Sequence, residues 1–588
     1  EAWEDVAQVL EADFWGTPLV SEQSHKSFRP ITTASFKVNL WGGRRLDGLD
    51  AYWFHVVDRV LHALVTLAVV VAADLVLSEG AAPRDGVAAV VTGLTFALHP
   101  VHTEAVCNTS GRAETLMAAF YLCGVIASVR RLHVATRGER NSLRFALTQT
   151  LAVVGWTVLA LFSKEQGITL PMTCAVIDFC ASDISLRSLL QALRRPDTDE
   201  DDAAKKARTQ DAQWFAARTA VLALATLTLG AFRLWLNGGA APNFIPDQNP
   251  AAFAQDWFTR VFSIAYVHFL YLQSFVLPVW LSCDWSGKSI ALITSPADPR
   301  VACVLATWAW FACSLWFAFL GPEHLRHRRK QILQATVAFL FIPFLLSSNL
   351  IVTVGTMKAE RVLYLPSVGF CMLLGVGFEV LVGVLTKGRT GDAEASWVLG
   401  VPFKLVLALY ALLALYAVKL HERNIAWSDP FKLWKSAYET NPISSHSRYN
   451  FALELTQQGD FERGLELILS VRKDDPHDIG TIYLEGLTLR QLNRCPEASK
   501  LADETMAQIG ATRKERAASG LPLSIKEIRR NLDDEEALML TLKSYCATTL
   551  GRMSQFVQDA LLKSPGNAQA RGRADELINL AKEAGVLN

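Results

Sequence analysis

The sequence predicts an all-α protein in two parts, a polytopic membrane domain followed by a short, tetratricopeptide-like α-solenoid. Three observations lead to this prediction. Hydrophobic residues make up 51% of the 588-residue chain and charged residues only 19%, a balance typical of a chain that lies largely in lipid. Long apolar segments follow one another over the first two-thirds of the chain, and shorter helical patterns follow them. The formal net charge is +0, so no basic excess indicates a nucleic-acid partner.

About ten apolar segments are long enough to cross ~30 Å of hydrocarbon with some tilt. They centre on residues 54–77, 86–99, 112–130, 145–162, 167–182, 214–236, 300–320, 331–353, 362–385 and 400–419. Basic loops at 130–140, 187–208 and 324–330 are predicted to be cytoplasmic, because cytoplasmic loops carry an excess of Lys and Arg. The 258–290 segment is also apolar, but a crossing there would put the last basic loop on the wrong side. We therefore expect 258–290 to be a re-entrant or interfacial element, broken at Pro278.

These patterns divide the chain into a first polar loop (1–50), a multi-pass membrane domain (51–420) and a helical repeat domain (421–588). The chain begins at Glu1 within a polar stretch, and we expect a first membrane helix upstream of it. In the last part, Pro442 and Pro476 are separated by 34 residues, the period of a tetratricopeptide repeat. The parity of the crossings places the first loop and the repeats on the same, non-cytoplasmic side.

Charged and imidazole side chains gather in the short turns between apolar segments. The clearest turns are HPVHTE (99–104), SKEQ (163–166) and KAER (358–361). Ionisable groups at membrane depth are costly unless they face protein or trapped water, so such clusters mark a functional site. The predicted topology places all three turns on the non-cytoplasmic side.

Histidines and carboxylates in and near these turns predict a polar pocket. We expect His99, His102 and Glu104 to form a hydrogen-bonded network. A metal site is the weaker alternative, because two histidines and a carboxylate can bind zinc but the H-x-x-H spacing here crosses a proline. His55 and Asp58 share one face of the first apolar helix, where a purely structural polar stripe is the alternative.

Three cations at the turns suit a phosphate ligand. Arg112, Lys164 and Arg361 are predicted to lie on one side of the membrane, and Arg binds phosphate bidentately while Lys supplies a point charge. For each cation alone, the alternative is a side chain that only snorkels to the interface. Each has an acidic neighbour, namely Glu114, Glu165 and Glu360.

The first loop contains acids, a histidine, cations and aromatic residues, Asp13 and Arg29 among them, but no Gly-rich phosphate loop and no G-x-S-x-G. This composition suits metal-independent group transfer in which a carboxylate acts as base toward an acceptor hydroxyl. The ten cysteines include no C-x-x-C pair, so neither a zinc site nor a disulfide framework is expected.

Motifs along nearly the whole chain resemble, in order, those of the transmembrane and tetratricopeptide-repeat-containing (TMTC) protein family. They are DFWGTPL (13–19), SHKSFRP (24–30), HPVHTEAV (99–106), GRAETL (111–116), SKEQGIT (163–169), NPAA (249–252), DWS (284–286), AERVLYLPS (359–367) and RNIAW (423–427). The resemblance implies a GT-C-type glycosyltransferase, embedded in the endoplasmic reticulum membrane with its repeats in the lumen. It would move mannose from dolichyl phosphate mannose to Ser or Thr hydroxyls of acceptor proteins bound by the repeats. It implies no cofactor and no metal.

The resemblance also implies roles for individual residues. The family's catalytic acidic pair would lie upstream of Glu1, which leaves Asp13 as a supporting residue or substitute base. Arg361, and after it Lys164 and Arg112, would bind the donor phosphate. The pocket network would comprise His55, Asp58, His99, His102, Glu104, Glu165, Glu360 and Arg29. Asp58 departs from the family, which usually has Asn at this place.

Two other functions fit parts of the pattern. A membrane-anchored repeat scaffold or folding adaptor would need the charged turns only as structure. A transporter would account for intramembrane Asp58 and Asp178, although no inverted repeat of broken helices is evident.

Overall fold

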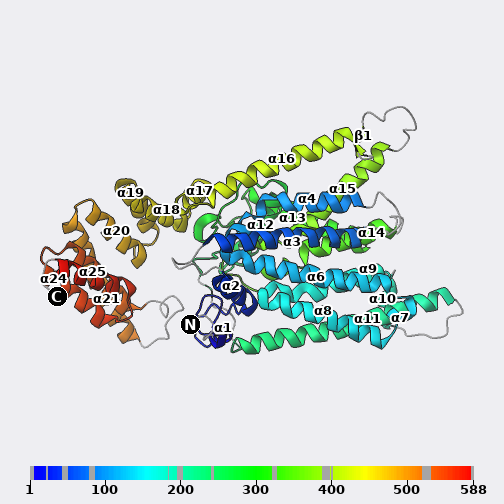
Figure 1. Cartoon of the computed structure of the whole chain (residues 1–588), viewed down its shortest axis with the longest axis horizontal. Helices are drawn as coiled ribbons and strands as arrows, with labels where there is room; N and C mark the ends of the chain where they lie inside the picture. Colours follow the sequence, from blue (N-terminus) through cyan, green and yellow to red (C-terminus); the bar gives the residue numbers. More distant parts are fainter. Residues whose placement is uncertain are drawn as a thin grey trace. The chain divides into compact units, whose positions relative to one another are not determined.

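The computed structural model describes most of the chain, and its internal contacts divide it into two compact units (Figure 1). The first unit comprises residues 1–283 and 291–427, and the second comprises 284–290 and 428–588. The described residues are 6–21, 24–42, 51–77, 86–182, 184–194, 203–239, 244, 246–320, 327–386, 397–398, 401–519 and 531–583. They are almost entirely helical, and strands β1 (Trp397–Val398) and β2 (Val401–Pro402) form one small antiparallel pair. The predicted all-α fold is confirmed.

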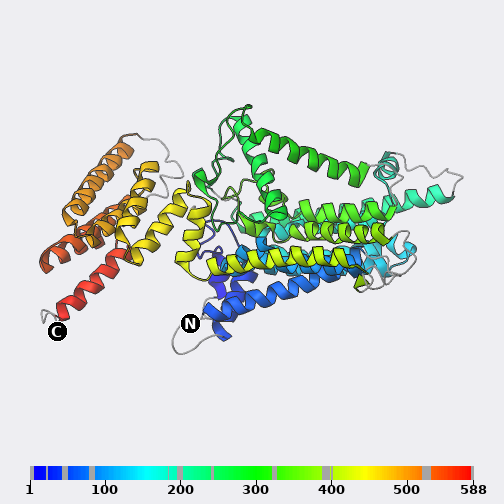
Figure 2. The same ribbon diagram turned by 90° about the horizontal axis from the view of Figure 1, so that it is seen from above.

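The first unit is a bundle of long helices that lie side by side in both views (Figures 1 and 2). Its α-helices are α1 (Val6–Glu11), α2 (Pro30–Gly42), α3 (Ala51–Leu77), α4 (Gly86–Leu98), α5 (Thr103–Cys107), α6 (Arg112–Val134), α7 (Arg137–Arg140), α8 (Leu143–Ser163), α9 (Leu170–Ala181), α10 (Leu186–Arg194), α11 (Ala203–Leu236), α12 (Trp257–Val276), α13 (Arg300–Leu315), α14 (His327–Phe341), α15 (Ser367–Thr386) and α16 (Phe403–Ala426). Short helical turns connect them: η1 (Pro100–His102), η2 (Thr109–Gly111), η3 (Glu165–Thr169), η5 (Trp316–Leu320), η6 (Leu345–Ser347) and η7 (Glu360–Leu363).

Seven helices among the described residues are long and apolar enough to cross a membrane, so the multi-pass membrane fold is confirmed. Gly86–Leu98 and Pro100–Cys107, bent by 49°, add an eighth crossing if they form one span. The helices in the other two predicted crossings, at 167–182 and 331–353, are shorter than the 18 residues of this criterion, so crossings there stay predictions. These segments hold α9 with 12 residues and α14 with 15, about 18 and 22 Å of helix. Prolines near their ends limit both helices, because proline is not tolerated in a helix interior.

The 258–290 segment begins as a continuous helix. Helix α12 has 20 residues and is not among the described helices that are long and apolar enough to cross a membrane. It ends at Val276, two residues before the break predicted at Pro278. The residues after it carry the DWS motif and contain one short turn of helix, η4 (Gly287–Ser289).

The charged turns and the first basic loop lie at opposite ends of the bundle. Helix α6 begins at Arg112, in one of the motif turns, and ends at Val134, within the basic loop. Its 23 residues separate the two turns by about 33 Å, close to the thickness of the hydrocarbon layer. Between these ends, buried apolar residues of α3, α4, α6, α8, α9 and α15 form one continuous core.

The second unit is a row of helix hairpins, as a repeat solenoid requires. Its helices are α17 (Pro430–Thr440), α18 (Ser445–Gln457), α19 (Phe461–Asp474), α20 (Ile479–Gln491), α21 (Cys495–Ser519), α23 (Leu532–Cys546), α24 (Leu550–Lys563) and α25 (Ala568–Glu583). Each helix packs on the next along the chain. A core of Leu465, Ile482, Ala502, Met539 and Leu542, among others, holds four of them together.

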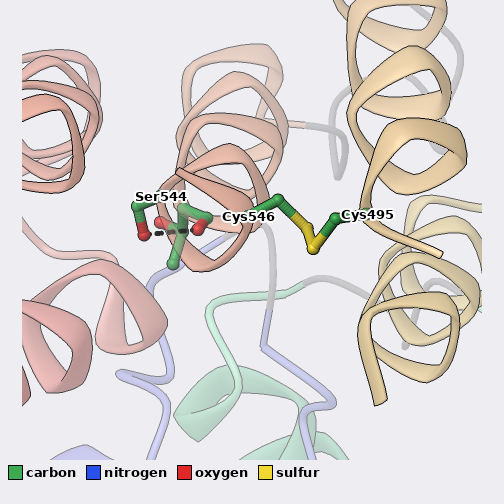
Figure 3. The surroundings of a disulfide bond; sticks show 4 residues. Cys495, Ser544 and Cys546 are labelled. Atoms are coloured by element: carbon green, nitrogen blue, oxygen red, sulfur yellow. Dashed lines mark hydrogen bonds between the residues drawn. A yellow bond between two sulfur atoms is a disulfide. The ribbon is translucent and has the colours of Figure 1, made fainter. Parts of the chain in front are cut away.

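A disulfide closes part of this unit. Cys495, at the start of α21, is bonded to Cys546, at the end of α23 (Figure 3). The expectation of no disulfide was wrong. The two residues are 51 positions apart and belong to no recognisable spacing motif, so only the packing of α21 against α23 brings them together.

The segment 284–290 packs within the second unit. Asp284 accepts hydrogen bonds from the backbone and hydroxyl of Ser286 at 3.3 and 2.9 Å and pairs with His446 at 3.4 Å. Lys288 pairs with Asp474 at 3.3 Å. The DWS motif thus shapes a turn that binds the first repeat hairpin.

Candidate functional site

Two glycines set the backbone of the charged turns. Helix α8 ends because Lys164 adopts an extended conformation, after which η3 begins. A Cβ at Gly167 would meet the backbone of Ala160 and Leu161 in α8, and a Cβ at Gly111 would meet the backbone of Ala105. Both turns therefore fold back closely on the preceding helix, and this fixes Lys164, Glu165 and Arg112 at its end.

Five charged side chains meet at the SKEQ turn. Lys164 is hydrogen-bonded to Glu114 of α6. Glu165 accepts three hydrogen bonds of 2.8–3.2 Å from Arg29 and pairs with Arg233 of α11 at 3.4 Å. The turn therefore joins the first loop, α6 and α11 through paired charges.

The electrostatic balance at this turn holds Glu165 ionised. Burial alone would raise the pKa of Glu165, but Arg29 and then Arg233 outweigh burial and lower it to about 2. Burial lowers the pKa of Lys164 well below its usual value, and nearby Arg29 and Arg361 lower it further. A bound anion beside Lys164 would reverse this shift, because an opposite charge favours the ammonium form.

Arg361 joins the same group of charges from η7. Its backbone N–H donates to Glu104 at 2.8 Å, and its guanidinium pairs with the other oxygen of the same carboxylate. The Arg361 side chain is 33% exposed, whereas that of Lys164 is 10% exposed. Arg361 therefore presents the larger accessible cationic surface of the two.

A second pair lies buried next to Arg361. Lys358 and Glu360 approach each other at 3.9 Å, and Glu360 accepts a 2.7 Å hydrogen bond from the backbone N–H of Ser282. Burial lowers the pKa of Lys358 and raises that of Glu360. Glu360 thus ties the KAER turn to the chain that follows α12.

Arg112 is placed differently from the other two predicted phosphate ligands. Its Nε donates to Asp58 at 2.5 Å, one Nη donates to Asn39 at 2.5 Å and the other to the carbonyl of Phe54 at 2.9 Å. The side chains of Arg112 and Asp58 are both 0% exposed. All three nitrogens of Arg112 are occupied by protein, so the geometry favours a structural ion pair over contact with a ligand.

The side chains of His99, His102 and Glu104 each have a separate partner, and the histidines lie around an aromatic core. His102 shares a 2.8 Å hydrogen bond with Ser367, and His99 bonds the carbonyl of Phe275 at 3.0 Å. His62 bonds Tyr364 at 2.8 Å, and its ring lies 5.5 Å from that of His102. These histidines join α3, α4, α12 and α15, but each bonds its own partner rather than a shared central atom.

No three His, Cys, Asp or Glu side chains of the described residues are grouped so as to hold a metal ion. His55 is half-buried near Asp58, whose charge it influences, and does not join the group around Lys164. The predicted pocket network is therefore split into a charged cluster, a histidine cluster and the buried Asp58–Arg112 pair.

Asp13 organises the first loop. One carboxylate oxygen accepts hydrogen bonds from the backbone N–H groups of Trp15 and Thr17, at 2.9 and 3.0 Å. The other accepts hydrogen bonds from the Ser24 hydroxyl and the backbone N–H of His25, both at 2.8 Å. The side chain is buried. A carboxylate offers about four lone-pair positions, so this geometry favours the supporting role over that of a base.

Several members of these clusters were not found from the sequence. Arg233 donates to the carbonyl of Phe28 and to Asn237 as well as to Glu165. A cation three residues before the end of the apolar α11 is the feature by which the sequence could have indicated Arg233 as a site residue. Asp178 is paired with Arg218 of α11 at 2.8 Å, so both carboxylates that suggested a transporter have arginine partners.

The sequence of this chain is similar to those of several known proteins. Residues 238–312 match the family model described as Protein O-mannosyl-transferase TMTC, DUF1736. The chain is 31% identical over 514 residues to Protein O-mannosyl-transferase TMTC3 of Mus musculus, a match that covers 85% of this chain and 50% of the relative. It is 31% identical over 463 residues to TMTC4 of Mus musculus, covering 76% and 58%. For Tmtc3 of Drosophila melanogaster the identity is 30% over 516 residues, covering 83% and 53%.

The chain spans about half the length of the curated relatives it matches. No solved structure matches it. The family match begins after the end of α11 and contains α12 and most of α13, and the three relatives cover 76–85% of this chain. The resemblance to the TMTC protein O-mannosyl-transferases that the motifs predicted is therefore confirmed.

Proposed function

We propose that this chain is a dolichyl-phosphate-mannose-dependent protein O-mannosyltransferase of the GT-C type. It would transfer mannose to Ser or Thr hydroxyls of proteins in the lumen of the endoplasmic reticulum. The observation that carries the proposal is 30–31% identity, over 76–85% of this chain, to relatives named protein O-mannosyl-transferases. The charged cluster at one end of a membrane bundle supports it, because a lipid-linked donor presents its phosphate at that depth.

Arg361 is our first choice for the donor phosphate. It is the most exposed of the three predicted cations, and its pairing with Glu104 orients the guanidinium. When the bond between mannose and phosphate breaks, negative charge grows on the phosphate oxygens. Preorganised cations beside those oxygens stabilise the transition state more than the ground state. The second candidate is Lys164, which lies close enough to Arg361 for that charge to lower the pKa of Lys164.

The acceptor hydroxyl needs a base, and the transfer would be inverting and metal-independent. The four hydrogen bonds received by Asp13 support its role in holding the first loop in place. The repeats of the second unit would bind the acceptor protein along their surface, as solenoids do.

The disulfide supports the lumenal placement of the second unit. Disulfides persist in oxidising compartments such as the lumen of the endoplasmic reticulum and are rare in the cytosol. The basic loop at the opposite end of α6 supports the same orientation, because such loops are usually cytoplasmic.

The experiment is transfer of radiolabelled mannose from dolichyl phosphate mannose to a Ser/Thr-rich acceptor, in microsomes that contain the full-length protein. Arg361→Lys keeps the charge but replaces a bidentate fork with a point charge, so we expect a loss of at least tenfold in transfer with unchanged protein levels. Arg463→Lys, at an exposed pair in the second unit, is the matched control. Transfer no higher than in microsomes without the chain would favour the membrane-anchored repeat scaffold instead.

A further inference from the structure

A cavity lies at the other end of the bundle and is lined by residues of α7, the end of α9 and α11. Figure 1 shows where these three helices lie. The cavity measures about 380 Å³, within the range of roughly 300–1,000 Å³ typical of small-molecule sites. Among the described residues, four arginines line it, Arg137, Arg140, Arg208 and Arg218, together with one acidic residue, Asp211. A polar cavity with this excess of guanidinium groups suits an anion.

Hydrogen bonds and ion pairs within the protein hold the floor of the cavity in place. Arg218 is 6% exposed and is bonded through all three nitrogens, to Asp178 at 2.8 and 3.0 Å, to the carbonyl of Arg140 at 2.9 Å and to Ser182 at 3.3 Å. Asp211 is likewise occupied, by Arg137 at 2.5 and 3.0 Å and by Asn141 at 2.8 Å. Arg218 is therefore neutralised by Asp178, and Asp211 is neutralised by Arg137.

Two arginines keep donors for a ligand. Arg140 uses one Nη, in a 3.1 Å hydrogen bond to the carbonyl of Ala181. Its Nε and other Nη make no hydrogen bond within the described part of the chain. The exposed Arg208 side chain has no hydrogen bond or ion pair there either. Two guanidinium groups with open forks match the oxygens of a phosphate, since each can donate two parallel hydrogen bonds.

The cavity also lies at the depth of lipid headgroups. Helix α11 has 34 residues, about 51 Å, of which roughly 20 residues suffice to cross the hydrocarbon. Its far end is held among the charged turns by Arg233. Counting about 20 residues back from Leu236 places Arg218 at the opposite hydrocarbon boundary, and Arg208 lies about 15 Å further out. The stretch of α11 between Arg218 and Arg208 therefore crosses the headgroup layer.

We propose that this arginine cavity binds the phosphate of an anionic lipid headgroup in the leaflet opposite the charged turns. The predicted topology makes that leaflet cytoplasmic, where anionic lipids are enriched and basic pockets between membrane helices bind them. The inference does not depend on mannosyl transfer. The same chemistry has a second possible source in a free phosphate compound, and the experiment separates the two.

The test uses the purified full chain in neutral detergent and native mass spectrometry, titrated with phosphatidylinositol 4-phosphate, phosphatidylcholine or inositol trisphosphate. Arg208→Gln removes no contact of the described protein, so it should fold normally, and we expect lipid binding about fivefold weaker. Adding Arg140→Gln should weaken it by roughly 25-fold. Arg144→Gln, an exposed arginine on neighbouring α8 that does not line the cavity, is the matched control and should have no effect.

Saturable binding of the anionic lipid but not of phosphatidylcholine, weakened in this order, supports the headgroup site. Binding of inositol trisphosphate as tight as that of the lipid, with the same dependence on Arg208, overturns the lipid source in favour of a soluble phosphate. Equal lipid binding by wild type and the Arg140→Gln/Arg208→Gln double variant overturns the site. So does a loss in Arg144→Gln as large as in Arg208→Gln.

Discussion

Replacing Asp58 with leucine should destabilise the bundle severely, although the new side chain is apolar and of similar size. The change leaves the fully buried Arg112 without its carboxylate, and an uncompensated buried charge costs about 3–5 kcal/mol. Arg112→Met alone should cost a similar amount, because it strands Asp58 instead. The double variant removes both charges. It leaves only Asn39 and the carbonyl of Phe54 without a donor, at about 1 kcal/mol each.

The free energy of unfolding in mixed detergent micelles, followed by circular dichroism during SDS titration, measures all three variants. We expect the double variant to lose about 2 kcal/mol, far less than the sum of the single variants. The exposed Arg494–Glu497 pair is the control, and its coupling energy should be negligible because solvent screens it. Strictly additive effects at Asp58 and Arg112 would refute the ion pair. An Arg112→Met protein of normal stability that has lost affinity for dolichyl phosphate would make Arg112 a donor ligand after all.

Three further predictions concern the first loop and the second unit. Asp13→Asn should loosen the first loop by roughly 3 kcal/mol, because the amide accepts only about two of the four hydrogen bonds. Faster hydrogen exchange of that loop would show this, whereas unchanged exchange with transfer reduced by about 10²-fold would make Asp13 the base. The Asp284–His446 hydrogen bond raises the pKa of His446, so the contact is strongest below about pH 6.5 and is lost as pH rises through the raised value. The protection factors of amides around Asp284, which are exchange rates corrected for the intrinsic rate at each pH, should therefore fall from about pH 6 to about pH 8 in wild type and should stay constant in His446→Phe. Replacing Cys495 and Cys546 with serine should cost about 4 kcal/mol for a closed loop of this length, and Cys495→Ser alone should expose one additional thiol to maleimide labelling under non-reducing conditions. A thiol at both positions in the wild-type protein would contradict the disulfide.

The sequence predicted the class of fold and the position of the charged turns, because both depend on local patterns. Apolar length marks a membrane helix, and ionisable residues at the helix ends mark the turns that need partners. It did not predict that α9 and α14 stop short. Counting apolar residues overlooks a proline that limits the helix, as Pro171 does for α9.

The partners of the charged residues could not be predicted at all. Arg112 and Arg361 look alike in the sequence, since each follows a turn and has an acidic neighbour. Only the packing of α3 against α6 reveals that Arg112 is enclosed by Asp58, 54 positions earlier. The same is true of Cys495 and Cys546, whose pairing depends on two helices meeting rather than on spacing.

Two of the buried ion pairs lie near opposite ends of the bundle. Asp58 encloses Arg112 near one end, and Asp178 encloses Arg218 near the other. In each case a buried carboxylate occupies an arginine and so fixes one helix against another. Each end of the bundle also has a more exposed arginine, Arg361 at the first end and Arg208 at the second. Arg361 pairs with Glu104 but keeps 33% of its side chain exposed, and Arg208 is exposed as well. Charge enclosed by protein and charge accessible to ligand therefore occur at both ends of the bundle.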